Sequence, residues 1–202
     1  MVIDSTGRDE RSMDLFSRLL KERVMFVGDV DEQSTSLITN QLLYLEAVDA
    51  ETPIQMYINS YGGSLTDVLS IYDTMEFVSP PIHTVCIGQA SSSASLLLAA
   101  GAKGHRAILP NASVMMHQPY GGRQGQQSDI AIAAKETLRQ RDLLESLYQK
   151  HCIKEGESAE ECKLRFRTAL ERDFYLTPIE AKDFGIVDRV QLPKEKSTET
   201  KA

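Results

Sequence analysis

Two consecutive units of strand, glycine-containing turn and helix constrain the fold of this chain most strongly. In the first unit, the apolar run 54–59 is followed by a Gly-Gly turn and by a helical pattern over 65–78. In the second unit, the apolar run 82–87 leads through Gly88 into a serine-rich helix start. Strands joined through helices are expected to pair in parallel, with the helices on the faces of the sheet. The sequence therefore predicts an α/β fold with a site at the loops that follow the strands.

The remaining segments fit the same class of fold. Further helices are predicted at 12–20, 31–48, 128–152, 159–170 and from Thr177 to Gly185, and further strands at 24–27, 105–109, 113–116 and 186–190. The helix after Thr177 has a capping-box-like start, because Thr, Pro and Glu occupy its N-cap, N1 and N3 positions. The helix at 128–152 is the longest, and its apolar side indicates packing against something other than its own sheet.

Composition excludes several classes of function. The formal net charge is −7 and the pI is near 5.2, which argues against a nucleic-acid or anionic-membrane partner. The longest apolar runs are far shorter than the ~20 residues that a membrane span requires. The three cysteines, Cys86, Cys152 and Cys162, are odd in number and lack metal-ligand spacing. We therefore expect free thiols in a reducing compartment and no metal site.

The length and apolar content predict one domain. A chain of 202 residues with 42% hydrophobic content can bury a single sizeable core, which we place at 13–191. Residues 1–12 are polar and expected to be flexible, and the tail 192–202 is expected to be disordered. The first residues resemble neither a secretory signal nor a transit peptide, so we expect a cytoplasmic protein, with an organelle matrix or plastid stroma as the alternative.

A serine cluster follows the strand at 82–87 and contains Ser92. A hydroxyl there would lie at a helix N-terminus, among free backbone N–H groups, although such serines are more often ordinary N-caps. His117 ends another strand-like run, and Asp173 follows a helix just before two aromatic residues. Taken singly, each has an ordinary structural interpretation. Acyl transfer by serine requires both a base and a carboxylate that orients it, so the three candidates gain meaning only together.

The turn Gly62-Gly63 could supply an electrophilic element for the same chemistry. Glycines let the backbone approach a ligand closely, and the N–H groups of Gly63 and Ser93 could both point at a developing oxyanion. A simple tight turn between strand and helix is the alternative interpretation. The Gly-x-Ser-x-Gly elbow of lipases and esterases is absent from the serine cluster.

The chain resembles the proteolytic subunits of the Clp protease, the ClpP family, over nearly its whole length. The resemblance rests on a series of motifs in a fixed order: Ser12-x-x-x-Phe16-Ser17-Arg18-Leu19-Leu20-Lys21-Glu22-Arg23, Tyr57-Ile58-Asn59-Ser60-x-Gly62-Gly63, Ile71-Tyr72-Asp73-Thr74-Met75, Gly88-Gln89-Ala90-x-Ser92, Met116-His117-Gln118-Pro119-x-Gly121-Gly122, Glu171-Arg172-Asp173 and Gly185-Ile186-Val187-Asp188. Each motif alone is weak, but the ordered set is highly specific.

The resemblance implies a serine endopeptidase that cleaves unfolded polypeptides. The family's nucleophile falls on Ser92, its histidine base on His117 and its aspartate on Asp173. Its oxyanion donors fall on Gly63 and Ser93. No cofactor is implied for this chain.

The resemblance also implies a crotonase-like fold, with a head of repeated ββα units and a handle. The handle (about 121–152) would consist of the long helix and a Gly-rich strand at 121–128. Family members assemble as homo-oligomers of two stacked seven-membered rings around a chamber, and they can also form mixed rings with a paralogue. The family's ring-contact arginine matches Arg172, which would face Gln126 in the handle.

A further implication is a partner, an AAA+ Clp ATPase that unfolds substrates and feeds them into the chamber. Hydrophobic pockets on the ring face would dock this unfoldase, near Tyr57, Phe77, Val85 and Ile87. ATP belongs to that partner, because this chain has no phosphate-binding loop of its own.

The chain departs from the family pattern at two places. The usual proline of the oxyanion turn is Tyr61, and the usual Met-Gly after the nucleophile is Ser93-Ala94. These departures leave open a weakly active or inactive ring subunit of a mixed Clp complex. A crotonase-fold enzyme that acts on acyl thioesters, with the same oxyanion turn but no triad, is a third alternative.

Overall fold

The computed structural model describes residues 2–4 and 11–192. Its helices are α1 (Leu15–Lys21), α2 (Glu32–Val48), α3 (Leu65–Phe77), α4 (Ala94–Ala99), α5 (Gln127–Cys152), α6 (Ala159–Leu170) and α7 (Pro178–Phe184). Its strands are β1 (Val2–Asp4), β2 (Arg11–Met13), β3 (Val24–Val27), β4 (Ile54–Ser60), β5 (Ile82–Ser91), β6 (Arg106–Ile108), β7 (Ser113–Met116), β8 (Phe174–Leu176) and β9 (Arg189–Val190). The disorder predicted for the C-terminal tail falls on residues outside the described part, apart from Leu192.

The strands form one large mixed sheet and one small antiparallel pair. The large sheet is seven-stranded, with the order β3-β4-β5-β6-β9, and β7 pairs with β5 and β8. All its pairings are parallel except β7 with β8. The small pair, β1 with β2, lies in the N-terminal segment. The predicted α/β fold is confirmed, and it is consistent with the ClpP fold.

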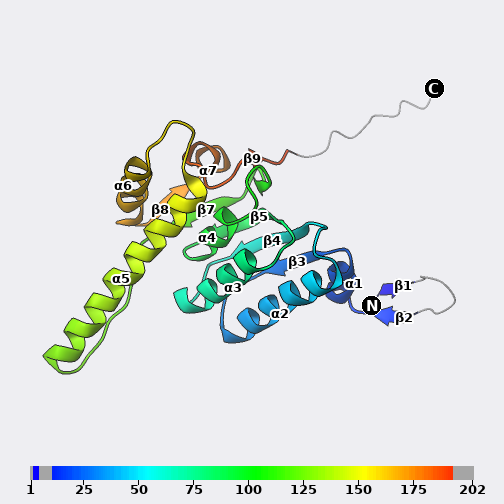
Figure 1. The fold of residues 1–202 in the computed structure, drawn as a ribbon, viewed down its shortest axis with the longest axis horizontal. Helices are drawn as coiled ribbons and strands as arrows, with labels where there is room; N and C mark the ends of the chain where they lie inside the picture. The colour runs from blue at the N-terminus through cyan, green and yellow to red at the C-terminus, as the bar shows by residue number, and fades with distance from the viewer. Residues whose placement is uncertain (1, 5–10, 193–202) are drawn as a thin grey trace.

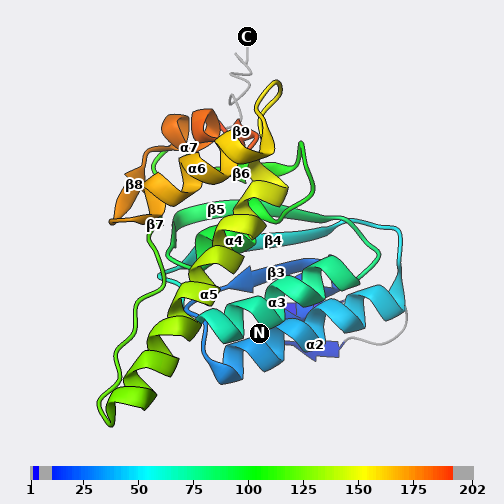
Figure 2. The same ribbon diagram turned by 60° about the vertical axis from the view of Figure 1, so that its left-hand side comes forward.

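Helices cover one face of the large sheet. Figures 1 and 2 show α2, α3 and α4 packed along this face. Residues Met56 and Ile58 of β4 point into it and are fully buried, whereas Tyr57 between them is only half-buried. This alternation follows from the two-residue period of a strand, which places successive side chains on opposite faces. The face that carries Tyr57 is therefore left largely uncovered.

Strand β5 is longer than predicted, and Gly88 lies inside it rather than in a turn. The first part of β5 pairs with β6 and the second part, from Gln89 to Ser91, pairs with β7. Gly88 has φ +79°, and a Cβ there would come within 2.7 Å of Asn59 Oδ1. The ladder to β4 also shifts register between Ile58 and Ser60. The glycine therefore forms a bulge that bends the strand without ending it, because pairing on both sides continues.

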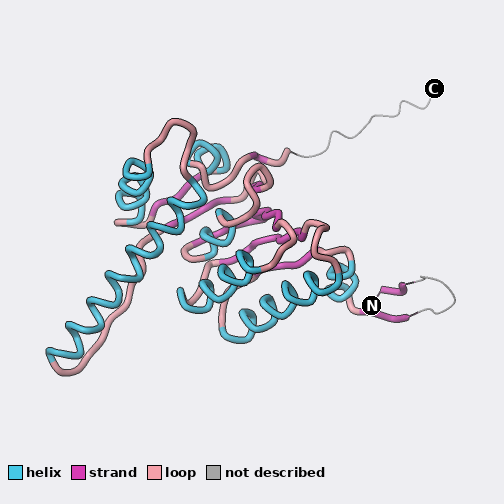
Figure 3. Tube along the Cα trace, in the orientation of Figure 1, coloured by secondary structure: helices cyan, strands magenta, loops and turns pink. Residues whose placement is uncertain are grey.

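Helix α5 projects beyond the sheet, as Figure 3 shows. Its outer part exposes three large apolar side chains, Ile130, Ile132 and Leu138. The preceding segment runs beside this part of the helix, but residues 121–126 form no strand. The prediction of a Gly-rich strand at 121–128 is therefore wrong for the single chain, because the segment finds no strand partner in the described residues. No helix of the described part is long and apolar enough to cross a membrane.

The C-terminal part contains one strand that the sequence did not suggest. Strand β8 pairs antiparallel with β7, although its three residues carry no periodic signal. Helix α7 begins at the predicted capping box of Thr177 and ends at Gly185, which adopts φ +95°. The last strand is only Arg189–Val190, shorter than predicted, because the preceding residues complete the end of α7 through hydrogen bonds to Ala181.

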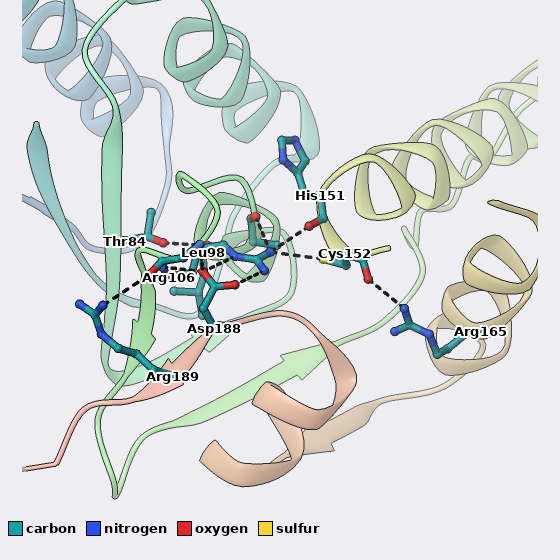
Figure 4. Close-up of polar contacts among 10 residues, drawn as sticks. Thr84, Leu98, Arg106, His151, Cys152, Arg165, Asp188 and Arg189 are labelled. Atoms are coloured by element: carbon teal, nitrogen blue, oxygen red, sulfur yellow. Dashed lines mark hydrogen bonds and ion pairs between the residues drawn. The ribbon is translucent and has the colours of Figure 1, made fainter. Parts of the chain in front are cut away.

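A buried arginine ties the elements around α4 together (Figure 4). Arg106 is 4% exposed, and its guanidinium donates to Asp188 Oδ1 at 2.6 Å and Oδ2 at 3.0 Å. Its Nη1 also donates to the carbonyls of Ala99 and His151, at 3.2 and 3.0 Å. These bonds join β6, the end of α4 and the end of α5 to the segment before β9. Arg106 thereby fixes the C-terminal end of α4, the helix that follows the serine cluster.

The Arg106–Asp188 pair leads to a prediction on stability and pH. Burial alone would raise the pKa of Asp188, but hydrogen bonds from Arg106 and Gly104 outweigh it and hold the pKa below its ordinary value. A depressed carboxyl pKa stabilises the fold above the unfolded pKa of about 3.9, and this contribution disappears as pH falls through the folded pKa. We expect Asp188→Asn to cost about 3 kcal/mol at pH 7, because it leaves a buried guanidinium without its counter-charge.

The measurement is thermal unfolding of wild type and Asp188→Asn between pH 7 and pH 3. The difference between their Tm values should narrow as pH falls below about 4. Asp183→Asn is the matched control, because no hydrogen bond or ion pair in the described structure joins this exposed carboxylate on α7 to Arg106. A difference that stays constant across this pH range would contradict the account.

Candidate active site

The structure brings Ser92 and His117 into direct contact. Ser92 lies just after β5, and His117 follows β7. These two strands are parallel neighbours, with Ser91 paired to Met115, so their carboxyl ends meet at one edge of the sheet. The distance between His117 Nε2 and Ser92 Oγ is 2.8 Å. A serine hydroxyl and an imidazole at this distance form the first half of a nucleophile–base arrangement.

Ser92 has an unusual backbone conformation. Its φ is +55°, which is unusual for a residue other than glycine. The turn is held on both sides, because the Ser92 N–H donates to Met115 O at 2.8 Å and its carbonyl accepts from Ser95 Oγ at 2.6 Å. A strained strand-to-helix turn of this kind exposes a hydroxyl at the top of the sheet. This conformation distinguishes Ser92 from the neighbouring serines.

Ser95 connects the turn to the long helix, a link that sequence reasoning missed. The Ser95 and Tyr148 hydroxyls lie 2.7 Å apart in the buried interior. Tyr148 belongs to α5 and stacks on Phe166 of α6, with ring centroids 4.9 Å apart. Burial raises the pKa of the Tyr148 hydroxyl above its ordinary value. The spacing of Tyr148 indicated only packing; its polar role depends on a contact across 53 residues of chain.

The Gly62-Gly63 turn lies against the serine turn and has no room for side chains. A Cβ on Gly63 would come within 1.9 Å of the Val30 carbonyl oxygen. A Cβ on Gly62, where φ is +97°, would come within 2.8 Å of the Ser91 carbonyl oxygen. The Val30 N–H donates to Gly62 O at 2.8 Å, which draws these backbones together. Glycine is therefore required here because the turn packs closely against the backbone of Val30 and Ser91.

The residue that replaces the family's usual proline has a structural use. The Tyr61 N–H donates to Asp29 Oδ1 at 2.8 Å. A proline has no N–H and could not make this bond. The next residue is also anchored, because the Gly62 N–H donates to Ser60 Oγ at 2.9 Å. The turn is therefore well held despite the substitution.

The two predicted oxyanion donors differ in their availability. The Ser93 N–H has no hydrogen-bond partner among the described residues. The Gly63 N–H, by contrast, donates to Ser93 Oγ at 3.2 Å. The same hydroxyl donates to Gly63 O at 3.0 Å. The side chain of Ser93 thus takes part in the geometry of the site, whereas sequence reasoning gave importance to its N–H alone.

Asp173 lies beside His117 but is not hydrogen-bonded to it. The antiparallel register of β7 and β8 pairs Met116 with Phe174, and continuing it by one residue places His117 opposite Asp173. Both residues line one pocket. No hydrogen bond joins them in the described part of the chain, and Asp173 is exposed. The loop after His117 is fastened nearby, because the Gln118 side chain donates to Glu171 O at 3.1 Å.

A cleft of about 710 Å³ opens in front of the Ser92 hydroxyl. Its polar side is formed by the two turns and His117. Other lining residues include Tyr61, Leu65, Met115, Tyr120 and Leu144. An extended chain with apolar side chains could occupy such a space. No group of three or more His, Cys, Asp or Glu side chains that could hold a metal ion is found among the described residues.

The residues predicted for contacts between subunits lie outside this cleft. Arg172 is exposed beside Asp173. Gln126 is the N-cap of α5, at the end of that helix that extends away from β8 in Figures 1 and 2. Arg172 and Gln126 are therefore not brought together within one chain.

Three of the four predicted docking residues lie on the uncovered sheet face, and the fourth ends helix α3. Tyr57 and Val85 are register partners on β4 and β5, and Ile87 follows on the same face of β5. Phe77 ends α3 and is 75% exposed. The sequence did not suggest that Phe26 of β3 stacks on Tyr57, with ring centroids 5.5 Å apart. Its position between Met25 and Val27 in the two-residue period of β3 could have indicated the shared face.

Comparison with known protein families gives one finding. The model of the family described as Clp protease matches residues 7–194 of the chain. The match includes both turns, His117 and Asp173, and therefore the whole cleft.

Proposed function

The chain belongs to the Clp protease family, which makes it a ClpP-type peptidase, and on this premise we propose that it is a serine endopeptidase with Ser92 as its nucleophile. The 2.8 Å contact between Ser92 Oγ and His117 Nε2 is the observation that carries the proposal. The position of the partly buried hydroxyl at a strained turn, lining a cleft of about 710 Å³, supports it.

In the proposed reaction, Ser92 Oγ attacks the scissile carbonyl carbon while His117 Nε2 accepts the hydroxyl proton. The tetrahedral intermediate places its negative oxygen toward the N–H groups of Gly63 and Ser93. Collapse breaks the C–N bond, and His117 returns the proton to the leaving amine. Water then attacks the acyl-enzyme by the same route and releases the second product. Asp173 orients His117 and stabilises its imidazolium form once its carboxylate comes within hydrogen-bond distance of the imidazole.

The proposed substrates are unfolded polypeptides that reach the serine inside a closed assembly. Exposed apolar residues on the outer part of α5 support packing against further copies of the chain, in stacked rings with Arg172 and Gln126 at their contact. The uncovered sheet face that carries Tyr57, Val85 and Ile87 supports docking of an AAA+ Clp ATPase, which would also contact the exposed Phe77 at the end of α3. The physiological role would be protein turnover and quality control.

Labelling with a fluorophosphonate probe tests the nucleophile directly. We expect the purified wild-type protein to be labelled and Ser92→Ala to remain unlabelled, because only an activated serine attacks the phosphorus centre. Ser91→Ala is the matched control and should be labelled like wild type, since within the described part of the chain the Ser91 hydroxyl hydrogen-bonds to Gln89 Oε1, at 3.4 Å, and not to His117 or Ser92. Equal labelling of wild type and Ser92→Ala would refute the assignment.

A weakly active or inactive ring subunit is the second candidate. Two observations favour it: the missing hydrogen bond between Asp173 and His117, and the occupation of the Gly63 N–H by Ser93 Oγ. Hydrolysis of a short fluorogenic peptide by the purified protein distinguishes the candidates. Turnover that disappears in Ser92→Ala would exclude the inactive subunit, and an absence of turnover by an assembled, labelled protein would favour it.

A further inference from the structure

The hydroxyl of Ser93 forms two hydrogen bonds with one residue of the opposite turn. It accepts from the Gly63 N–H at 3.2 Å and donates to Gly63 O at 3.0 Å. Ser93 is 7% exposed, and both residues line the cleft in front of Ser92. The methionine usual at this position in the family has no hydroxyl that could make these bonds. The contact is therefore a feature of this chain rather than of its motif.

The Gly63 N–H is one of the two donors that the proposed reaction needs. A donor stabilises the oxyanion only where it points to the position of the developing charge. In this structure the group points to a neutral hydroxyl oxygen, whereas the second donor, the Ser93 N–H, has no partner in the described chain. Half of the oxyanion site is thus occupied by the side chain of the residue that supplies the other half.

We infer that Ser93 is a positioning residue whose hydroxyl acts as a reversible latch on the oxyanion site. This inference rests on the proposed function, and it adds that the Ser93 hydroxyl competes with the oxyanion for the Gly63 N–H. When the tetrahedral intermediate forms, its oxyanion takes the Gly63 N–H, because charge-assisted hydrogen bonds are about twice as strong as neutral ones. The Ser93 hydroxyl then turns toward the cleft. Such rotation is fast, so the latch lowers the rate through the free energy of the bonds it gives up.

Removal of the latch should accelerate catalysis. In Ser93→Ala both backbone N–H groups remain and the competing hydroxyl is gone, so kcat for a short peptide should rise by about two- to tenfold, with KM nearly unchanged. The kcat of Ser93→Cys should rise less, because a thiol is a weak donor and acceptor that retains part of the contact. Ser91→Ala is the control, since its hydroxyl does not reach Gly63. Rates are expressed per site titrated with fluorophosphonate, which corrects for unfolded protein.

Inhibition by a peptide boronate gives a second measurement, whose Ki would not change if Ser93 had only a structural role. Its adduct with Ser92 places an oxygen at the oxyanion position, whereas the same peptide without the boronic acid forms no adduct. Ser93→Ala should lower the Ki of the boronate by about the factor by which kcat rises and leave the affinity of the plain peptide unchanged. Unchanged or reduced kcat and boronate affinity in labelled Ser93→Ala would overturn the latch. Absence of Ser92 labelling in the wild type would instead overturn the proposed function.

Discussion

His117→Ala is expected to lower kcat for peptide hydrolysis by about 10⁴-fold or more. The imidazole Nε2 lies 2.8 Å from Ser92 Oγ, and among the side chains described around this hydroxyl it is the one positioned to accept its proton. Without it, the attack must proceed from a hydroxyl with an unperturbed, high pKa. The leaving amine also loses its proton donor, so both halves of the reaction are slowed.

The measurement is the initial rate on a fluorogenic peptide, together with the rate of fluorophosphonate labelling of Ser92. Both should fall in His117→Ala, whereas unfolding should change little because His117 is only partly buried. His105→Ala is the matched control. This histidine stacks on His83 away from the cleft, with ring centroids 3.9 Å apart, so its loss should leave kcat unchanged. Retention of more than about one hundredth of wild-type kcat in His117→Ala would rule out the proposed base.

Gly63→Ala is expected to produce the second largest loss, about 10²-fold in kcat. A methyl group there would come within 1.9 Å of Val30 O and 2.7 Å of Val30 C. Both are backbone atoms held by the bond from Val30 N to Gly62 O, so the turn itself must move. Displacement of the Gly63 N–H by about 1 Å removes it from the position of the developing charge.

Gly28→Ala is the matched control for this variant. A Cβ at Gly28 meets no atom within 4 Å, and the residue lies outside the cleft, so kcat should stay close to that of wild type. Rates of Gly63→Ala are again taken per labelled serine, because the displaced turn also reduces stability. If labelled Gly63→Ala keeps kcat within about threefold of wild type, the Gly63 N–H is not an oxyanion donor.

Local sequence patterns were sufficient for most elements of the fold. Apolar residues at helical spacing identified α2 and α3, and the Thr177 capping box and Gly185 marked both ends of α7. These signals are reliable because propensity, capping and periodicity act within a few residues. They fail where strand pairing determines whether a segment becomes a strand. Strand β8 has three residues and forms only because β7 offers a free edge.

Helix α5 and the Gly-rich segment beside it illustrate the same limit. The apolar spacing along α5 indicated a helix with an unpaired side, and Ile132 at 68% exposure is consistent with that expectation. The sequence predicts a strand for the Gly-rich segment beside it, yet this segment pairs with no strand among residues 2–4 and 11–192. A strand requires backbone partners, and whether another copy of the chain supplies them is not encoded in the segment itself.

The sequence by itself determined the α/β class, the close turn at Gly62-Gly63 and the candidates Ser92, His117 and Asp173. Periodicity and residue type suffice for the fold class and the turn, because both depend on local backbone preference. The three candidates were singled out only by the ordered motifs that the chain shares with the Clp protease family. Only the tertiary structure decided that Ser92 has a positive φ, that Tyr148 reaches Ser95, and that Ser93 Oγ occupies the Gly63 N–H. Each of these depends on atoms that approach within hydrogen-bond distance across 30 or more residues or on strain imposed by neighbouring strands, and sequence spacing carries no such distances.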